Sequence, residues 1–397
     1  MRPFLISAAL TLPLFLLSAC GSNEAEEEPQ QQAAAPAPAD DNDADELASR
    51  DPAPGAAVKS VIPDAEQRPM MQLQVVLERL GFGPGVIDGK QGVSLTNALK
   101  GFQESRDIPV TGELDEATKG ALARWDNIPA TRVVTIPRSW GDIEFAAVPE
   151  GAPEQAKMTR LGYESMAEKL AERFHTTPEI LAQLNPGGRP AQARVRSSPS
   201  PTASPSQSGS NSSSGAGPVF SPGQQLRVPN IGADRIAAAE VDNKDWLDTL
   251  RSLGVGTDQP SAARVVVDES DGWLKAYDES DVLIAMYTVT TGSQNDPLPI
   301  GNWEVVGVAY NPPFAYDPTL FWDVSDSEES QQLPPGPNGP VGVVWIDLDK
   351  EHYGIHGTPA PETIGRAQSH GCVRLTNWDA ARLAQMVSGS TKVVFQK

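Results

Sequence analysis

The pattern of apolar and polar positions divides the chain into a helical part and a strand-rich part. Apolar residues recur at helical spacing over residues 71–80, 94–103 and 163–175, which predicts amphipathic helices. Beyond residue 262 the pattern changes to short runs rich in Val, Ile, Tyr and Trp, divided by turns that contain Asp, Gly and Ser. Short strands at regular spacing predict an all-β sandwich or a barrel-like sheet over residues 262–397. The chain is therefore expected to be multidomain.

Turn and capping signals predict three helices in residues 61–126. Gly81 follows the first apolar helical run, and glycine commonly ends a helix. Asp115 stands where an N-cap is expected before the third helix. The range contains no histidine and no carboxylate pair that would indicate catalysis. We expect a small all-α domain built from core and turn residues.

A second small domain is predicted over residues 155–230. The helix over 163–175 is followed by Pro178, and proline suits the first turn of a further helix. Residues 190–218 are dominated by Ser, Pro, Ala and Gly, which predicts a low-complexity insert. Regular structure is expected to resume after the insert, and a polar helix is expected over 242–253.

The first residues, 1–20, have the features of a secretion signal. The apolar run over 4–17 is too short to span a bilayer comfortably and has the length of a signal-peptide core. Small residues before Cys20 resemble a bacterial lipobox, which implies that Cys20 is lipidated. The alternative is an ordinary signal peptide with Cys20 incidental. Gly21 is not an aspartate, which by the rules for Gram-negative lipoproteins favours the outer membrane.

The composition agrees with a location outside the cytoplasm. Residues 21–60 are acidic and poor in bulky apolar residues, so they predict a disordered tether. The formal net charge of the chain is −21, which argues against a nucleic-acid partner because such binding needs basic faces. We expect a lipid-anchored protein of the periplasm.

Candidate chemistry is concentrated near the C-terminus. Cys372 is one of two cysteines in the chain, and His356 and His370 are near it in sequence. A thiol attacks as its thiolate, so a base must take the proton, and neutral imidazole does this at physiological pH. The backbone amides around Gly371 are candidate donors to the oxyanion of an attacked carbonyl. The guanidinium of Arg374 could hold a substrate carboxylate.

Less specific interpretations of these residues stay open. Most free cysteines are inert buried thiols, and Cys372 alone would predict nothing more. A zinc site made from Cys372, His370 and His356 has poor spacing and no fourth ligand, so no metal is expected. His352 is expected at the surface or at a strand end. His175 is expected on the surface of a helix.

The histidine and cysteine motifs carry a family resemblance. His356-Gly357-Thr358 followed by Ser369-His370-Gly371-Cys372-Val373-Arg374 resembles the signature of the L,D-transpeptidase (YkuD-type) catalytic domain. The resemblance covers residues 262–397 and implies a mainly-β fold, with Leu298 where the family usually has Thr. It implies Cys372 as the nucleophile and His356 as the general base. The further roles it implies are orientation of the imidazole by the carbonyl of Gly357, and positioning of the oxyanion and substrate by Ser369, His370, Gly371 and Arg374.

Two further resemblances concern the helical part. Residues 61–126 resemble the three-helix peptidoglycan-binding domain through Leu80-Gly81-Phe82, Asp88-Gly89, Phe102-Gln103 and Thr111-Gly112. Residues 155–230, joined across the insert, resemble a small α/β LysM glycan-binding module through Leu184-Asn185-Pro186 and Val228-Pro229. The first strand of that module is degenerate at 161–165. This resemblance implies a scaffold that either binds glycan or has lost that ability.

Together the resemblances imply a cofactor-free peptidoglycan L,D-transpeptidase. Its partners would be stem peptides and glycan, with an amine acceptor on a second stem peptide or on a protein. Two alternatives stay open, namely hydrolysis with water as the acceptor and a non-catalytic lipoprotein that tethers the wall. The long segment 311–340, rich in Pro and aromatic residues, is expected to form either a lid or a hydrophobic latch.

Overall fold

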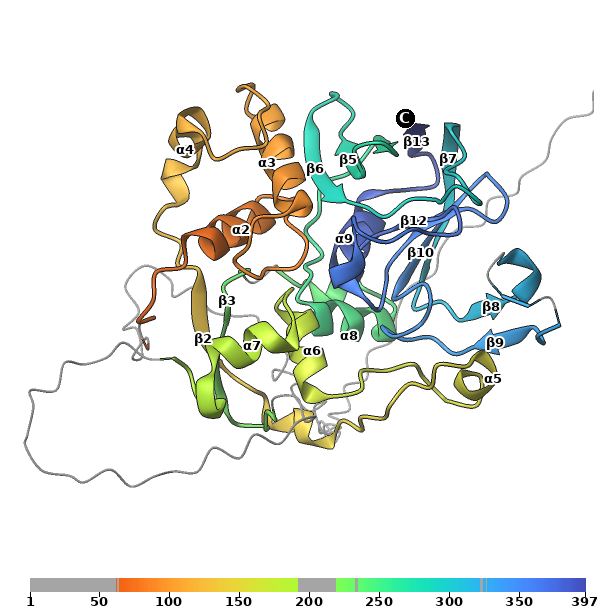
Figure 1. The fold of residues 1–397 in the computed structure, drawn as a ribbon, viewed down its shortest axis with the longest axis horizontal. Helices are drawn as coiled ribbons and strands as arrows, with labels where there is room; N and C mark the ends of the chain where they lie inside the picture. The colour runs from red at the N-terminus through yellow and green to blue at the C-terminus, as the bar shows by residue number, and fades with distance from the viewer. Residues whose placement is uncertain (1–61, 63, 192–218, 233–234, 322–323, 326) are drawn as a thin grey trace, which may run out of the picture. The chain divides into compact units, whose positions relative to one another are not determined.

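The computed structural model describes residues 62, 64–191, 219–232, 235–321, 324–325 and 327–397 (Figure 1). All of them belong to one compact unit, Asn42–Lys397. The predicted signal peptide 1–20 with Cys20, the tether 21–60 and nearly all of the insert 190–218 lie outside the described residues. In the described part of the chain, no helix combines the length and apolar character needed to cross a membrane.

The first domain contains the three predicted helices, which are drawn in orange tones in Figure 1. They are α2 (Pro69–Arg79), α3 (Val93–Ser105) and α4 (Glu116–Leu122). The predicted N-cap is confirmed, because Oδ1 of Asp115 accepts a hydrogen bond of 2.8 Å from the Thr118 amide. Leu77, Leu99 and Phe102 are fully or almost fully buried between the helices, so burial of their apolar faces stabilises the domain.

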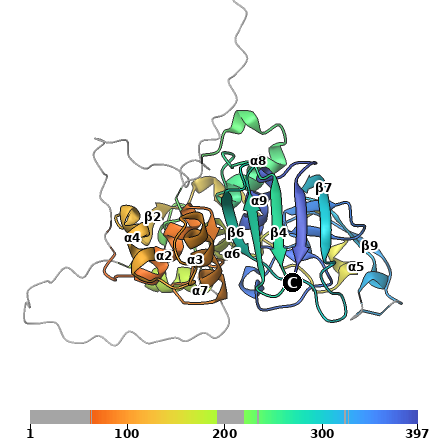
Figure 2. The same ribbon diagram turned by 90° about the horizontal axis from the view of Figure 1, so that it is seen from above.

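This domain also contributes a strand to the sheet of the C-terminal domain. The short strand β1 (Phe82–Gly83) pairs in parallel with β6 (Leu283–Thr288), with Phe82 opposite Met286. Helix α3 lies close to β6, as Figure 2 shows. A Cβ atom on Gly101 of α3 would stand 2.7 Å from Cβ of Met286, so only glycine lets the helix approach this closely.

The middle region consists of two helices and two strands. Along the chain, helices α6 (Met166–Arg173) and α7 (Pro178–Leu184) follow β2 (Thr131–Thr135) and precede β3 (Gln225–Pro229). The two strands pair antiparallel. The first strand therefore lies before the predicted boundary at residue 155, and 161–165 is not a strand. The β-branched run of β2 carried the signal for it. The LysM resemblance stays a prediction.

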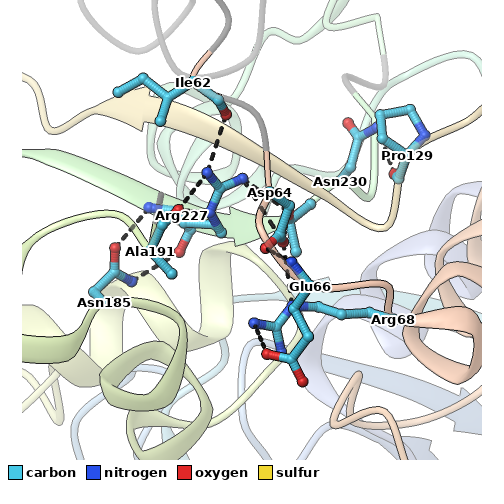
Figure 3. A network of polar contacts seen from close by, with 10 residues as sticks. Ile62, Asp64, Glu66, Arg68, Pro129, Asn185, Ala191, Arg227 and Asn230 are labelled. Atoms are coloured by element: carbon cyan, nitrogen blue, oxygen red, sulfur yellow. Dashed lines mark hydrogen bonds and ion pairs between the residues drawn. The ribbon is translucent and has the colours of Figure 1, made fainter. Parts of the chain in front are cut away.

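Arg227 of β3 ties this region to the chain before α2 (Figure 3). Its guanidinium donates hydrogen bonds to the carbonyl oxygens of Ala191, at 2.6 and 2.9 Å, and of Ile62, at 3.0 Å. The same group lies 3.7 Å from the Asp64 carboxylate. Because Arg227 is 1% exposed, these partners compensate the burial of its charge. Asn185 adds hydrogen bonds to the backbone of Arg227 on both sides.

The C-terminal strands form one connected sheet, which agrees with the predicted mainly-β domain. Within the described residues the order is β1-β6-β5-β4-β13-β7-β10-β11-β12. The remaining bounds are β4 (Arg264–Asp268), β5 (Trp273–Tyr277), β7 (Gly301–Tyr310), β10 (Val344–Leu348), β11 (Gly354–His356), β12 (Val373–Arg374) and β13 (Lys392–Gln396). Most of these runs agree with the predicted strands. A smaller pair, β8 (Phe314–Tyr316) and β9 (Gln331–Leu333), lies beside the short helix α5 (Ala152–Gln155).

Helix α9 (Asn377–Met386) packs against β10 and β11 and is almost entirely buried. Its Trp378 is fully buried, in the cluster that also contains Ile346 and Ile355. The predicted polar helix is α8 (Lys244–Leu253), which Asn243 caps. Because α9 follows directly after β12, packing of this helix fixes the end of the strand that carries the candidate site.

The predicted surface position of His175 is wrong. Its side chain is fully buried, with Nδ1 2.7 Å from Oε1 of Glu78 and Nε2 3.0 Å from the carbonyl oxygen of Leu253. The ring also stacks on Trp378, with the centroids 4.7 Å apart. The sequence pattern shows one apolar face on this helix, whereas residues from α2, α8 and α9 enclose the histidine that follows it. The buried histidine therefore lies where the three domains meet.

Candidate active site

Two neighbouring strands bring the predicted base and nucleophile together. Strand β11 pairs in parallel with β12, so that Ile355 lies opposite Val373 and His356 lies opposite Arg374. Cys372 directly precedes β12. The amide of Leu375 donates a hydrogen bond of 2.8 Å to the carbonyl oxygen of His356 and extends this pairing. The strand register thus holds two distant segments of the sequence side by side.

The imidazole of His356 is buried and oriented by the backbone. Its Nδ1 lies 2.7 Å from the carbonyl oxygen of Gly357, the group that was expected to orient it. A carbonyl can only accept, so Nδ1 carries the proton and Nε2 presents its lone pair. The ring stacks on Trp345, with centroids 5.5 Å apart and an interplanar angle of 20°. This arrangement fixes both the tautomer and the plane of the ring.

Burial keeps this imidazole uncharged. The pKa of His356 is lowered to about 3, first because burial removes water from the charged form and then because the Arg374 guanidinium is nearby; the hydrogen bond to Gly357 opposes both effects. His356 is 4% exposed. At physiological pH the ring is therefore neutral and able to accept a proton.

Gly357 allows the backbone to approach α9 closely. A Cβ atom at this position would lie 2.2 Å from Oδ1 of Asn377, the first residue of α9. The same Oδ1 accepts a hydrogen bond of 3.2 Å from the amide of Val343. Close contact with a fixed amide side chain explains why glycine follows the histidine.

The thiol of Cys372 is half-buried and faces backbone groups. Its Sγ lies 3.7 Å from the carbonyl oxygen of His352. Burial raises the pKa of Cys372, although the Gly354 amide and the Arg374 guanidinium oppose this. The resting pair is therefore a neutral thiol and a neutral imidazole. His352 is exposed, as predicted, and it contributes its backbone alone.

Ser369 and Arg374 hold the loop on either side of the cysteine. The Oγ of Ser369 donates a hydrogen bond of 2.6 Å to the carbonyl oxygen of Cys372, and its amide donates to Thr291 at 3.0 Å. The backbone of Arg374 exchanges hydrogen bonds of 2.8 and 3.1 Å with Thr290. Ser369 thus acts on the backbone of the loop, and the backbone of Thr290 and Thr291 fixes both of its ends.

Gly371 and His370 face aromatic side chains. Gly371 has φ +98°, and a Cβ atom there would lie 2.7 Å from Cε1 of Tyr353. The ring of His370 packs edge-on against Phe321, with centroids 5.0 Å apart. Phe321 in turn stacks on Tyr316 at 5.6 Å. The aromatic cluster of segment 311–340 therefore reaches the candidate site, which the sequence could only suggest.

The middle region contacts Asn377, the residue of α9 that packs against Gly357. Nδ2 of Asn377 donates to Oε1 of Glu172 at 2.7 Å and to the carbonyl oxygen of Pro337 at 3.2 Å. Burial raises the pKa of Glu172 to about 8, although the hydrogen bond from Asn377 opposes the shift. Asn338 lies 2.7 Å from Oε1 of Glu168. Because Glu172 and Asn377 stand more than two hundred positions apart, no local pattern could predict their contact.

The arrangement can perform acyl transfer to a thiol. Among the described residues, no group of three or more His, Cys, Asp or Glu side chains is placed to hold a metal ion. The site offers one nucleophile, one neutral base and a tight turn of backbone amides around Gly371. These are the elements that a cysteine nucleophile requires.

Comparison with known proteins identifies two regions. Residues 262–395 match the L,D-transpeptidase catalytic domain (YkuD), and residues 67–122 match a putative peptidoglycan binding domain. The chain is 51% identical over 130 residues to the "Putative L,D-transpeptidase YkuD" of Bacillus licheniformis, which covers 33% of this chain and 63% of that protein. It is 48% identical over 61 residues to the protein of the same name from Bacillus subtilis, a match that covers 15% of this chain and 37% of that protein.

A solved structure also resembles part of the chain. L,D-transpeptidase 3 from Mycobacterium tuberculosis matches with 17% identity and a TM-score of 0.29, over 34% of this chain and 61% of that chain. The chain thus spans less than two thirds of the length of these relatives. The matched catalytic region contains all seven predicted residues from His356 to Arg374.

Proposed function

We propose that the protein is a peptidoglycan L,D-transpeptidase that works through an acyl-enzyme on Cys372. The observation that carries the proposal is the β11–β12 pairing, which sets His356 beside the loop of Cys372 within the region that matches the L,D-transpeptidase catalytic domain. The match of residues 67–122 to a peptidoglycan-binding domain supports a substrate in the cell wall.

In the first step, Sγ of Cys372 attacks the carbonyl carbon of the bond between an L-centre and a terminal D-residue of a stem peptide. Nε2 of His356 takes the thiol proton, since the resting imidazole is neutral. Amides near Gly371 stabilise the oxyanion. The C–N bond then breaks, the leaving amine receives the proton from His356, and a thioester remains on the enzyme.

In the second step, an amine acceptor attacks the thioester carbonyl and gives its proton to His356. The C–S bond breaks, Cys372 recovers its proton, and a new amide joins the two peptides. A second stem peptide as acceptor gives an L,D-crosslink, and a protein amine gives attachment to the wall. Water as acceptor would give carboxypeptidase activity, and exclusion of water from the site decides between these outcomes.

The remaining parts of the chain are proposed to hold this enzyme at the wall. Cys20 carries the lipid anchor, residues 21–60 form the tether, and the protein works in the periplasm, attached to the outer membrane. Residues 131–231 are proposed as the LysM-like glycan module, an assignment supported by the β2–α6–α7–β3 order. Loss of membrane association in Cys20→Ser, with unchanged acylation, is the expected result.

Intact-mass spectrometry tests the enzymatic proposal. The full chain with Cys20→Ser is incubated with a tetrapeptide-stem muropeptide, beside a matched protein that also carries Cys372→Ala. We expect an adduct that has lost the terminal D-residue, present on the first protein and absent from the second. Products released afterwards distinguish crosslinking from hydrolysis. Absence of any adduct from a protein that still sediments with peptidoglycan would favour a non-catalytic tethering lipoprotein.

A further inference from the structure

A cleft of about 330 Å³ lies where the three domains meet, a size within the usual range of ligand sites. Each domain contributes part of its wall. The residues that carry the argument are Lys90 and Val93 from the first domain, Glu179 and Ile180 from α7, and Glu362 and Arg366 from the segment that joins His356 to Ser369. Neither Cys372 nor His356 lines the cleft, so it is distinct from the candidate active site.

Close packing connects this cleft to the catalytic loop. Gly365, between Ile364 and Arg366 of the wall, has φ +74°, and a Cβ atom there would lie 3.2 Å from Val93 and 2.8 Å from Thr288. Its amide donates a hydrogen bond of 2.9 Å to Oγ1 of Thr290. Thr290 is also the backbone partner of Arg374. A ligand in the cleft would therefore lie against the segment that supports the catalytic loop.

The charges of the cleft are available for a ligand. Lys90, Arg366, Glu179 and Glu362 are exposed side chains. Across the described residues, none of these four makes a salt bridge within 4.0 Å. With Asp88, whose Oδ1 accepts hydrogen bonds from the Gln74 side chain and the Lys90 amide, two cations and three carboxylates line one cleft. A ligand with both carboxylate and ammonium groups complements such a lining, and Val93 and Ile180 supply apolar contact for small side chains.

We propose that this cleft binds the peptide stem of a peptidoglycan strand, at a site separate from the stem that Cys372 attacks. The inference rests on the proposed function, since it takes peptidoglycan as the substrate. A stem peptide carries free carboxylates and, where it serves as an amine acceptor, an ammonium group. Binding here would hold a strand on the enzyme while another of its stems reacts, which raises the effective concentration of substrate at Cys372.

Charge reversals on the walls of the cleft test the site. Two variants change walls that come from different domains, namely Lys90→Glu and Glu179→Lys. The matched controls lie outside the cleft and are Lys119→Glu on α4 and Glu154→Lys on α5. Each change is made in the full chain with Cys372→Ala, and co-sedimentation is measured with purified sacculi and with sacculi stripped of stems by an amidase. We expect the two cleft variants to bind intact sacculi roughly 3- to 10-fold more weakly than the parent does, and the control variants to bind like the parent. The parent should bind stripped sacculi more weakly than intact ones.

Acylation by a soluble tetrapeptide muropeptide separates this inference from the proposed function. With Cys372 present, Lys90→Glu and Glu179→Lys are expected to acylate at the parental rate. Unchanged sedimentation of both cleft variants, equal binding of stripped sacculi, or no binding by the parent would each overturn the stem site. A parent that binds sacculi through their stems but never forms an adduct would overturn the enzymatic proposal and leave the cleft assignment standing.

Discussion

His356 lies directly opposite Arg374 in the parallel pairing of β11 with β12. The same register places Cys372 directly before β12 and sets a guanidinium near the imidazole. The positive charge adds to the effect of burial and disfavours protonation of the ring. One strand pairing therefore assembles the two candidate catalytic residues and adds to the effect of burial, which keeps the base in its proton-accepting form.

The pH dependence of acylation follows from this relationship. Because the pKa of His356 is lowered to about 3, the reactive neutral ring persists as pH falls, and the acylation rate constant is expected to stay nearly level on the acid side from pH 7 to 5. For an ordinary histidine, with a pKa near 6.5, the rate constant would fall roughly 25-fold over the same range. Rapid-quench mass spectrometry of the thioester measures the profile.

Two variants sharpen this pH prediction. Arg374→Gln removes the nearby cation, so the pKa of His356 is expected to rise. The acid limb of the pH profile of acylation should therefore move to higher pH. His356→Ala removes the base and is expected to reduce acylation by about 10²- to 10⁴-fold. A parental acid limb near pH 6.5, unchanged in Arg374→Gln, would contradict a neutral resting imidazole.

Gly371→Ala is predicted to impair acylation about 10- to 100-fold. The added Cβ would stand 2.7 Å from Tyr353 and would occupy a backbone conformation, φ +98°, that favours glycine. The loop amides beside Cys372 would move from their positions. Single-turnover acylation measures the effect. Gly120→Ala is the control, because nothing lies within 4 Å of a Cβ there; equal rates for both variants would show that the turn tolerates displacement.

Local sequence signals were sufficient to predict the helix caps and strands whose formation depends on residues close by in the sequence. The N-cap at Asp115 agrees with the capping signal, and the strands β4 and β5 agree with the predicted short apolar runs. The catalytic motif could also be read, because His356 and Cys372 occur in short strings with specific spacing. Their spatial relation could not, because it depends on the pairing of β11 with β12.

Long-range packing explains what the sequence did not reveal. His175 carries a polar side chain on an amphipathic helix, so solvent exposure was the expectation. Its actual partners, Glu78, Leu253 and Trp378, come from three other segments. The β2 strand was missed for a related reason, since its partner β3 follows only after an intervening insert. Local periodicity cannot report such contacts.

Phe321→Ala is expected to slow acylation by roughly 2- to 10-fold with little change in unfolding temperature. The phenyl ring packs on His370 and on Tyr316, and an aromatic pair contributes about 0.5–1.5 kcal/mol, which corresponds to that range of rates. Leu320→Ala is a matched control, because Leu320 is next in sequence and 49% exposed. Equal acylation by both variants and the parent would show that segment 311–340 does not position His370.

Glu172→Gln is predicted to stabilise the protein at alkaline pH. The folded pKa of Glu172 is about 8 against an ordinary 4.5, so the native state holds a proton that the unfolded chain has released. The contribution of this protonated carboxyl to the free energy of unfolding is therefore fully present below about pH 4.5 and is lost as pH rises to about 8. Glutamine never ionises and keeps an oxygen that accepts from Asn377.

Urea unfolding at pH 5 and pH 8 measures this difference. At pH 5 the protonated carboxyl resembles an amide, so the free energies of unfolding of Glu172→Gln and the parent should nearly agree. At pH 8 the variant should be more stable by roughly 1–3 kcal/mol, whereas Glu154→Gln on the exposed helix α5 should follow the parent at both pH values. Lower stability of Glu172→Gln at pH 8 would mean that the carboxylate is favourably paired when charged. In that case the contact between Glu172 and Asn377 would stabilise the domain junction through charge rather than through a neutral hydrogen bond.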